Sequence, residues 1–402
     1  MKKSIAIVGS GPSALMLAIS LDKSLYEVTI YERNFAPGRK FLVAGDGGFN
    51  LTHSENIEAF ITRYTPGNFL EKCLRHFTNI DLRDWLTTIG IDTYVGTSKR
   101  IFPVKGIKPI DVLNAILTEV KNNNVQIKTQ HDWIGWNSDE TLLINYKEEA
   151  ISVKADFVIF ALGGASWSKT GSDGTWLPLF HEKKIETVPF QASNCAFEIK
   201  WPEPFIEQAN GKALKNISVT CDDKENKGEL VITKFGIEGG VVYALSPVIR
   251  ELLRKENNVS IFIDLKPTHT LSDVQTKLRA RGNKSYTKLL KDALHLDEVQ
   301  IGLLKTILSK EEFTDLDTLA CKIKQLPLSI TAMGPIEDAI SAVGGISLNE
   351  VDSFYQLKKL PRHYVIGEML DWDAPTGGYL LQACFSMGRY LACKLNKDTS
   401  SC

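Results

Sequence analysis

The stretch Ser4-Ile-Ala-Ile-Val-Gly9-Ser-Gly11-Pro-Ser-Ala14, near the start of the chain, decides the fold. Its first five residues are mostly apolar and predict a buried strand, and a helical pattern follows the glycines. The pattern G-x-G-x-x-A between a strand and a helix is typical of a dinucleotide-binding turn. Gly9 permits the tight turn, Gly11 lets the backbone approach a pyrophosphate, and Ala14 allows helix and strand to pack closely. The chain is therefore predicted to open with a Rossmann-like nucleotide-binding unit.

Glu32 supplies a carboxylate at the position where a nucleotide-binding unit binds ribose. The predicted second strand, 28–31, ends at Glu32, about 20 residues after the glycine turn. A carboxylate there accepts hydrogen bonds from ribose hydroxyls and repels a 2′-phosphate. The helix predicted over 13–21 presents free N–H groups to phosphates. A tight turn without a ligand is the plainer reading of the glycines, but strand, helix and acid together favour a dinucleotide, either NAD or FAD.

Two later glycine segments bear on the choice between NAD and FAD. Residues 157–162 predict a buried strand that runs into Gly163-Gly164, which by itself is equally a plain turn at a strand end. Residues 364–366 predict a short strand followed by Gly367-Glu368 and by Asp371, and these acids can bind polyol hydroxyls.

The second of these segments continues into Gly377-Gly378-Tyr379 and a predicted helix over 380–394. The first N–H groups of that helix can face a flavin ring or a phosphate. A unit that engages its ligand from both ends of the chain suits the long FAD molecule better than NAD. FAD is therefore the predicted cofactor.

Changes in composition along the chain predict several parts. The predicted fold class is α/β, a Rossmann-like FAD-binding domain with an inserted β-rich subdomain and a small helical subdomain, because 402 residues exceed one ordinary core. Alternating short runs indicate antiparallel strands after residue 190, and leucines at helical spacing indicate helices after 270. The predicted bounds are 1–190 and 334–402 for the FAD-binding domain, 191–269 and 326–333 for the β-rich part, and 270–325 for the helical part. Within the first domain, residues 69–90 and 109–123 have helical periodicity, with apolar positions three and four apart.

The overall composition argues against several classes of protein. Lys and Arg total 47 and Asp and Glu total 48, so no basic excess points to nucleic acid or an anionic membrane. No apolar run approaches the roughly 18 residues of a membrane span. Seven cysteines without a C-x-x-C pair favour free thiols in a reducing cytoplasm and argue against a dithiol relay. Seven dispersed histidines make a bound metal an unfavoured reading. A cytoplasmic protein without metal or membrane contact is predicted.

An ordered set of motifs resembles the HI0933-like family of bacterial flavoproteins, often labelled NAD(FAD)-utilizing dehydrogenases or aminoacetone-oxidase-like FAD enzymes. The motifs are Gly9–Ala14 with Glu32, Gly38-Arg39-Lys40, Asn50-Leu-Thr-His53, Phe157–Gly164, Gly171–Gly174, Phe235–Gly239, Val343–Ile346 and Gly367–Tyr379. Two departures, Gly47-Gly48-Phe49-Asn50 and Glu238-Gly239-Gly240, resemble a divergent branch of that family.

The resemblance implies a set of FAD contacts and the same three-part architecture. The implied contacts are Gly9, Gly11, Ser13, Ala14, Glu32, Arg33, Arg39, Lys40, Gly163, Gly164, Gly367, Glu368, Asp371, Gly378, Tyr379 and Leu380. Arg39 and Lys40 can neutralise a pyrophosphate, and a solvated basic loop is the alternative.

No catalytic residue is assigned from the sequence, and two candidates remain. His53 could donate a proton near the flavin, although a lone histidine is more often structural. Arg100 stands in a segment similar to one near the family's active site and could bind an anionic substrate, and a surface salt bridge is the alternative.

The predicted function is that of an FAD-dependent oxidoreductase acting on an unidentified small-molecule substrate, with NAD(P)H as an optional transient donor. One alternative is a flavin-dependent RNA-modifying enzyme. It would use the basic stretch 277–291, which is more simply a solvated helix face. The other alternative is a non-catalytic FAD-binding protein.

Overall fold

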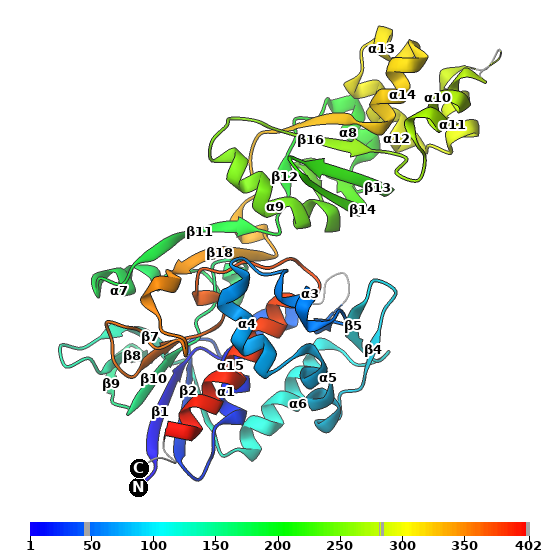
Figure 1. Ribbon diagram of the computed structural model, residues 1–402. Coiled ribbons are helices and arrows are strands. Elements are labelled where there is room, and N and C mark those ends of the chain that lie inside the picture. Colours follow the sequence, from blue (N-terminus) through cyan, green and yellow to red (C-terminus); the bar gives the residue numbers. More distant parts are fainter. Residues whose placement is uncertain (44–48, 281, 283–284, 399–402) are drawn as a thin grey trace. The chain divides into compact units, whose positions relative to one another are not determined.

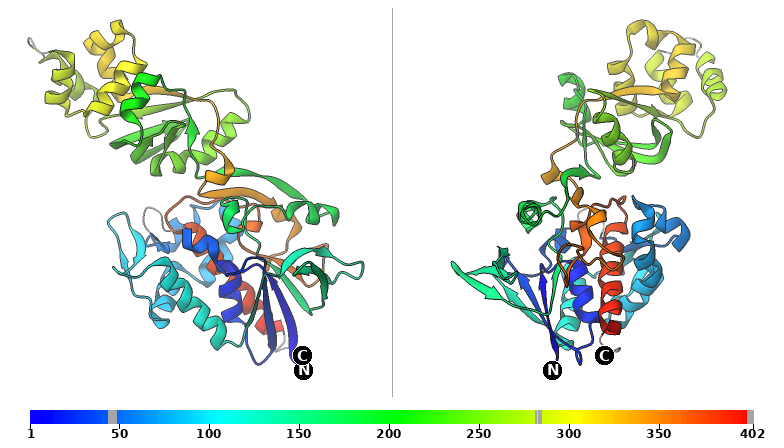
Figure 2. Two further views of the ribbon diagram at one scale, coloured as in Figure 1. Left: turned by 180° about the vertical axis from the view of Figure 1, so that it is seen from behind. Right: turned by 60° about the vertical axis from the view of Figure 1, so that its left-hand side comes forward.

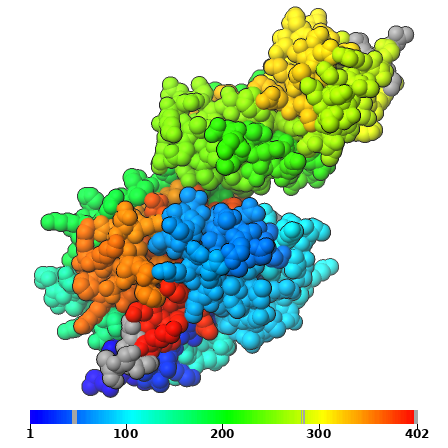
Figure 3. Space-filling model, viewed as in Figure 1, coloured from blue at the N-terminus to red at the C-terminus, as the bar shows by residue number. Residues whose placement is uncertain are grey.

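A computed structural model describes residues 1–43, 49–280, 282 and 285–398. The chain divides into two units, Met1–Gln191 with Ser341–Cys402, and Ala192–Ile340. The first unit thus contains both ends of the chain, and in Figure 3 its orange and red C-terminal segments lie beside the blue N-terminal ones. The Gly47-Gly48 departure noted in the sequence lies outside the described residues.

A five-stranded parallel sheet forms the centre of the first unit, with the order β19-β10-β1-β2-β6. Its strands are β1 (Lys3–Val8), β2 (Tyr26–Glu32), β6 (Gln126–Thr129), β10 (Phe157–Phe160) and β19 (His363–Val365). The inner strands are apolar and buried because helices and a second sheet cover both faces. This sheet confirms the predicted α/β Rossmann-like class.

Helices cover one face of this sheet, and an antiparallel sheet covers the other (Figure 2). Helix α1 (Pro12–Ser20) packs along α15 (Tyr379–Asp398). A Cβ on Gly388 would stand 2.4 Å from the carbonyl oxygen of Ser13, so only glycine allows this close approach. On the opposite face, Trp133 of β7 (Asp132–Trp136) packs on Phe160 of β10.

Shorter elements complete the first unit (Figure 1). The helices are α2 (Arg39–Val43), α3 (Ile57–Ile61), α4 (Gly67–His76), α5 (Asn79–Thr88), α6 (Pro109–Asn122) and α7 (Leu177–Glu182). The strands are β3 (Thr52–His53), β4 (Thr93–Val95), β5 (Arg100–Pro103), β8 (Leu142–Tyr146), β9 (Glu149–Val153), β11 (Thr187–Ser193) and β18 (Ser341–Ile346). Single 3₁₀ turns occur at Ser168–Thr170, Leu348–Glu350 and Gly367–Met369.

The second unit is built on a six-stranded antiparallel sheet, in the order β12-β15-β14-β13-β16-β17. Its strands are β12 (Phe197–Glu198), β13 (Ala213–Cys221), β14 (Lys224–Ile232), β15 (Gly236–Glu238), β16 (Val259–Asp264) and β17 (Leu326–Ile330). Its helices are α8 (Glu203–Ala209), α9 (Gly240–Leu253), α10 (Leu271–Arg279), α11 (Tyr286–Leu294), α12 (Glu298–Ile307), α13 (Lys310–Thr314) and α14 (Leu316–Lys324), with a 3₁₀ turn at Ile336–Asp338.

Apolar side chains of the strands and of the helices share one core in the second unit; Ile261 and Leu304 are both fully buried in it. The predicted division into β-rich and helical subdomains near residue 270 stays a prediction. No helix in the described part of the chain is both long and apolar enough to cross a membrane.

The helical periodicity over 69–90 belongs to two helices, α4 and α5. Helix α4 ends at His76, and Thr78 begins α5 with a capping box. The Asp81 carboxylate accepts hydrogen bonds from the backbone N–H and the hydroxyl of Thr78, and the Thr78 hydroxyl accepts from the backbone N–H of Asp81. Such a cap satisfies the free N–H groups of a new helix start.

Candidate cofactor site

The glycine turn lies where β1, β2 and β10 end. The N–H of Gly9 donates to the carbonyl oxygen of Tyr31 at 2.8 Å. Gly9 has a φ of +96°, and a Cβ there would stand 2.4 Å from the carbonyl oxygen of Ala161. A Cβ on Gly11 would meet nothing within 4 Å. Gly9 is therefore required by packing, whereas Gly11 borders open space at the start of α1.

That open space belongs to a cleft within the first unit. Many of the residues expected to contact a cofactor line it: Gly9, Gly11, Ser13, Glu32, Arg33, Arg39, Lys40, Gly163, Gly367 and Glu368. Segments from the beginning, middle and end of the first unit therefore meet at one cleft.

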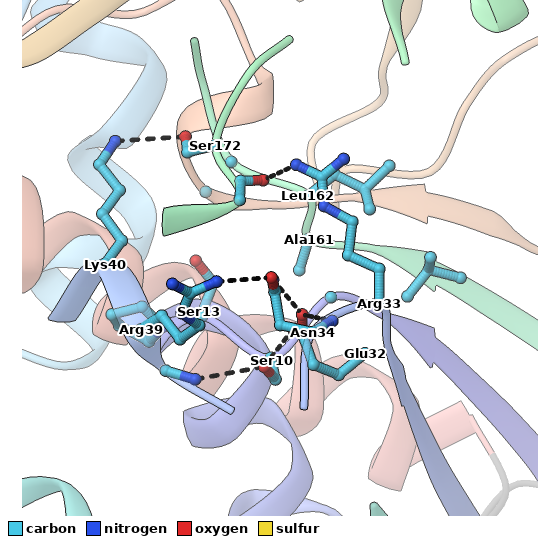
Figure 4. Close-up of a pocket in the computed structure, with 18 of the residues that line it drawn as sticks. Ser10, Ser13, Glu32, Arg33, Asn34, Arg39, Lys40, Ala161, Leu162 and Ser172 are labelled. Carbon is cyan, nitrogen blue, oxygen red and sulfur yellow. Dashed lines mark hydrogen bonds between the residues drawn. The ribbon is translucent and has the colours of Figure 1, made fainter. Parts of the chain in front are cut away.

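Glu32 is held at the end of β2 by three hydrogen-bond donors (Figure 4). The Ser10 hydroxyl donates to one carboxylate oxygen, and the backbone N–H and side-chain amide of Asn34 donate to the other at 2.8 and 2.7 Å. Arg39 in turn donates to the amide oxygen of Asn34 at 2.8 Å. This network fixes a buried carboxylate toward the cleft, where it can accept from ribose hydroxyls. Sequence reasoning missed Ser10 and Asn34, because each acts only through Glu32.

Arg33 ties the segment 171–173 to the same end of the cleft. Its guanidinium donates to the carbonyl oxygen of Gly171 and to the Asp173 carboxylate, which is 2.8 Å away. Burial alone would raise the pKa of Asp173, but hydrogen bonds from Thr175 and Arg33 outweigh it and hold that pKa below its usual value. Arg33 therefore stabilises a wall of the cleft through its partners.

Lys40 supplies a cation to the other part of the cleft. Its ammonium nitrogen lies 2.9 Å from a carboxylate oxygen of Glu368, 3.0 Å from the Ser166 hydroxyl and 3.4 Å from the Ser172 hydroxyl. Figure 4 shows the side chain extending from α2 toward Ser172. The open approach to Gly11, the start of α1 and this cation suit an anionic pyrophosphate, and Glu32 suits the adjoining ribose. The residues present thus fit a dinucleotide.

Six of the predicted contacts do not line this cleft: Ala14, Gly164, Asp371, Gly378, Tyr379 and Leu380. Ala14 is fully buried in the core. A Cβ on Gly378 would stand 2.4 Å from Cα of Thr52, which explains the glycine there by packing. Cys384 of α15 does line the cleft, so this helix borders the cleft at Cys384 and not at its first residues.

His53 belongs to a second polar cluster at the start of α15. Its Nδ1 accepts a hydrogen bond from the backbone N–H of Glu55 at 3.2 Å, and its ring stacks on Tyr379. Burial lowers the pKa of His53, although the Glu55 charge opposes the shift. The imidazole is therefore neutral with the proton on Nε2, which favours the structural reading of this residue.

The carboxylate of Glu55 organises this second cluster. The Tyr379 hydroxyl donates to it at 2.6 Å, and Arg63 donates to both of its oxygens at 3.0 and 2.9 Å. Burial raises the pKa of Glu55, but the bonds from Arg63 and Tyr379 outweigh this effect and lower it overall. Glu55 is thus ionised and fully occupied by its two donors.

Arg100 is the cation of this cluster that has no such partner. It stands opposite His53 in the β3–β5 pairing, and a Cβ on Gly377 would lie 3.3 Å from its Nε. Within the described residues its guanidinium forms no hydrogen bond and no ion pair. The salt bridge considered from the sequence is therefore absent there, and the guanidinium is available to a ligand.

Comparison with known proteins places the chain among flavoprotein folds. A 3-dehydro-bile acid Δ(4,6)-reductase of Clostridium scindens is 26% identical, covering 96% of this chain and 97% of that protein. A ribosomal RNA dihydrouridine synthase of Haemophilus influenzae is 22% identical, covering 98% of each chain. In fold, the chain is similar to the 3-ketosteroid-Δ4-(5α)-dehydrogenase of Rhodococcus jostii, with a TM-score of 0.52 at 10% identity, covering 97% of this chain and 96% of that one.

The family profile described as HI0933-like protein Rossmann domain matches residues 3–394, nearly the whole chain. The resemblance drawn from the ordered motifs is thereby confirmed. The chain belongs to the HI0933-like protein family.

Proposed function

We propose that this protein is an FAD-dependent reductase of carbon–carbon double bonds that are conjugated with a carbonyl group. The observation that carries the proposal is a reaction type common to relatives that match nearly the whole chain. A Δ(4,6)-reductase of 3-dehydro-bile acids and a dihydrouridine synthase both saturate such a bond, as their names state. In the first the bonds are conjugated with a 3-keto group, and in the second with the uracil C4 carbonyl.

The cleft supports FAD as the cofactor. Its glycine turn and Lys40 suit the pyrophosphate, and Glu32, held by Ser10 and Asn34, suits the adenosine ribose. Glu368 and Cys384 of α15 bring the C-terminal part of the chain to the same cleft. Bound FAD supplies hydride-transfer chemistry, so the protein needs no nucleophile or metal of its own for that step.

Arg100 is the residue proposed to act on the substrate. Adding hydride to a conjugated alkene builds negative charge on the carbonyl oxygen, and a guanidinium beside that oxygen stabilises the charge. Arg100 is free of partners among the described residues, whereas Arg63 of the same cluster is bound to Glu55. A Cβ on Gly377 would stand 3.3 Å from Nε of Arg100, so the glycine avoids a tight contact with this guanidinium.

A nicotinamide donor is proposed to bind transiently. The chain has a single G-x-G-x-x-A fingerprint, at 9–14, and the proposed FAD site uses it. NADH or NADPH would therefore reduce the flavin and leave before the substrate enters, which predicts parallel lines in a double-reciprocal plot.

The experiment is flavin reoxidation without oxygen. The purified protein is loaded with FAD, reduced with NADPH or dithionite, and mixed with 2-cyclohexen-1-one, 4-androstene-3,17-dione or uridine. Cyclohexene and cyclohexanone are the matched controls, because each keeps only one of the two conjugated groups. Reoxidation by the conjugated compounds alone supports the proposal. Reduced flavin that none of them reoxidises would contradict the reductase assignment, and failure to bind FAD would contradict the cofactor.

An RNA substrate is the second candidate, and the two dihydrouridine synthase relatives favour it. The basic stretch 277–291 gives it limited support. Arg279 pairs with Asp317 and Lys291 with Glu298, while Arg281 and Lys284 lie outside the described residues. Reoxidation of the reduced protein by ribosomal RNA but not by cyclic enones, with binding that weakens steeply in salt, would establish this candidate instead.

A further inference from the structure

One carboxylate in the candidate cofactor cleft, that of Asp132, has no hydrogen-bond or ion-pair partner among the described residues. Asp132 is the first residue of β7 and lines the cleft. Within the described residues its carboxylate accepts no hydrogen bond and forms no ion pair. By contrast, Glu32 is held by Ser10 and Asn34, and Asp173 by Arg33 and Thr175. Asp132 is thus the acid at this end whose hydrogen-bonding capacity is unused.

The backbone places Asp132 beside Glu32, the acid proposed to bind the ribose. The N–H of His131, the preceding residue, donates to the carbonyl oxygen of Glu32 at 2.9 Å, so β7 begins where β2 ends. A ribose held by Glu32 carries its base on the adjoining carbon. The base therefore lies within reach of the first side chain of β7.

The local charge decides which chemical group can approach. Burial raises the pKa of Asp132; Arg33 opposes the shift, and the Asp173 and Glu32 carboxylates add to it. Three carboxylates around one guanidinium repel a phosphate or a carbonyl oxygen and favour a hydrogen-bond donor. On adenine, the exocyclic amino group is such a donor and points away from the ribose.

We propose that Asp132 accepts a hydrogen bond from the exocyclic amino group of the adenine ring and so selects adenine-containing flavin. The inference rests on the proposed FAD site and adds to it a residue that recognises the adenine base. Hypoxanthine has a carbonyl oxygen in place of that amino group, so the carboxylate would repel it.

The test compares two cofactors on the apoprotein, with fluorescence of the flavin as the readout of binding. FAD is titrated against flavin hypoxanthine dinucleotide, which differs only at the base. Wild type should bind FAD roughly tenfold to a hundredfold more tightly, the value of a hydrogen bond to a charged group. Asp132→Asn should reduce or reverse the preference, because an amide can donate to the hypoxanthine oxygen. Asp132→Ala should reduce it without reversal.

A matched control is Glu149→Gln, an exposed acid on β9 of the same small sheet. It should keep the wild-type preference. Equal binding of the two cofactors by wild type would overturn the inference and leave FAD binding intact, and so would an unchanged preference in Asp132→Asn. If neither cofactor bound, the FAD site itself would be refuted. The wild-type comparison needs no variant, so a folding defect in Asp132→Asn would not prevent a decision.

Discussion

The ammonium nitrogen of Lys40 lies 2.9 Å from a carboxylate oxygen of Glu368, a residue 328 positions farther along the chain. This pair joins α2, after the glycine turn, to the 3₁₀ turn that follows β19. Because both residues line the candidate cofactor cleft, the pair joins the N-terminal and C-terminal segments of the first unit at that cleft.

Replacing Lys40 by Met should weaken FAD binding by about tenfold or more, since a charge-assisted hydrogen bond to phosphate is lost. The Glu368 carboxylate would also face the anion without its cation. The Lys40→Met/Glu368→Gln double variant should therefore bind FAD better than Lys40→Met alone. Fluorescence titration of each apoprotein measures this, with Lys169→Met, an exposed neighbouring lysine, as control. If Lys40→Met bound FAD with wild-type affinity, Lys40 would not be a residue that contacts the cofactor.

Substitution of the two turn glycines should affect different properties: flavin binding at Gly11 and the stability of the fold at Gly9. Gly11→Val should keep the melting temperature of the wild type and lose flavin, because its side chain enters open space where the pyrophosphate is proposed to lie. Gly9→Ala should destabilise the fold by about 2–4 kcal/mol, because its Cβ would overlap the Ala161 carbonyl at a positive φ. Thermal melts and flavin content of both variants test the contrast. Full flavin occupancy in Gly11→Val would show that the turn does not hold the cofactor.

The nucleotide-binding opening could be predicted because its signals are local. The strand, the glycines and Glu32 all fall within one βαβ stretch, and their spacing alone fixes their arrangement. The Thr78-Asn-Ile-Asp81 pattern is also local, and as a capping signal it marks the break between α4 and α5 within the helical stretch 69–90. Strand β7 was missed because Gly135 and a register shift interrupt its alternation.

The rest of the site depends on contacts between distant segments. Lys40 with Glu368, Arg33 with Asp173, and Tyr379 with Glu55 are pairs that no periodicity reveals. The lack of a hydrogen-bond or ion-pair partner for Arg100 among the described residues cannot be read from the sequence either, because it depends on which side chains the fold brings near it. The sequence gives the types of residue, and only the tertiary packing shows which charged side chains are left unpaired and can bind a ligand.

Arg100→Gln should lower kcat/KM for a conjugated ketone by roughly a hundredfold while leaving FAD affinity unchanged. A decrease of this size is typical when an enzyme loses one hydrogen-bond donor to a developing oxyanion. Arg100→Lys should recover part of the rate, since it keeps the charge without the planar fork. Lys99→Gln, an exposed cation next to it, is the matched control. A normal rate in Arg100→Gln would exclude this residue from substrate activation.

His363 makes the stability of the protein depend on pH. Its Nδ1 lies 3.0 Å from the carbonyl oxygen of Pro361, and its ring stacks on Phe160. Its Nε2 is buried without a hydrogen-bond partner among the described groups. Burial lowers the pKa of His363 below its ordinary value of 6.5, although the bond to Pro361 opposes the shift. The folded state therefore holds the neutral ring.

Because the folded pKa is below the unfolded one, His363 contributes stability that is present above the unfolded pKa and lost as the pH falls through the folded pKa. Burial likewise lowers the pKa values of His53 and His76, which act in the same direction. The free energy of unfolding should thus decrease as the pH is lowered from about 8 to about 5. His363→Phe keeps an aromatic ring against Phe160 and cannot titrate, so it should flatten this dependence, whereas His181→Phe at an exposed position should not. Urea unfolding at several pH values measures the slope, and an unchanged slope in His363→Phe would assign the dependence to other groups.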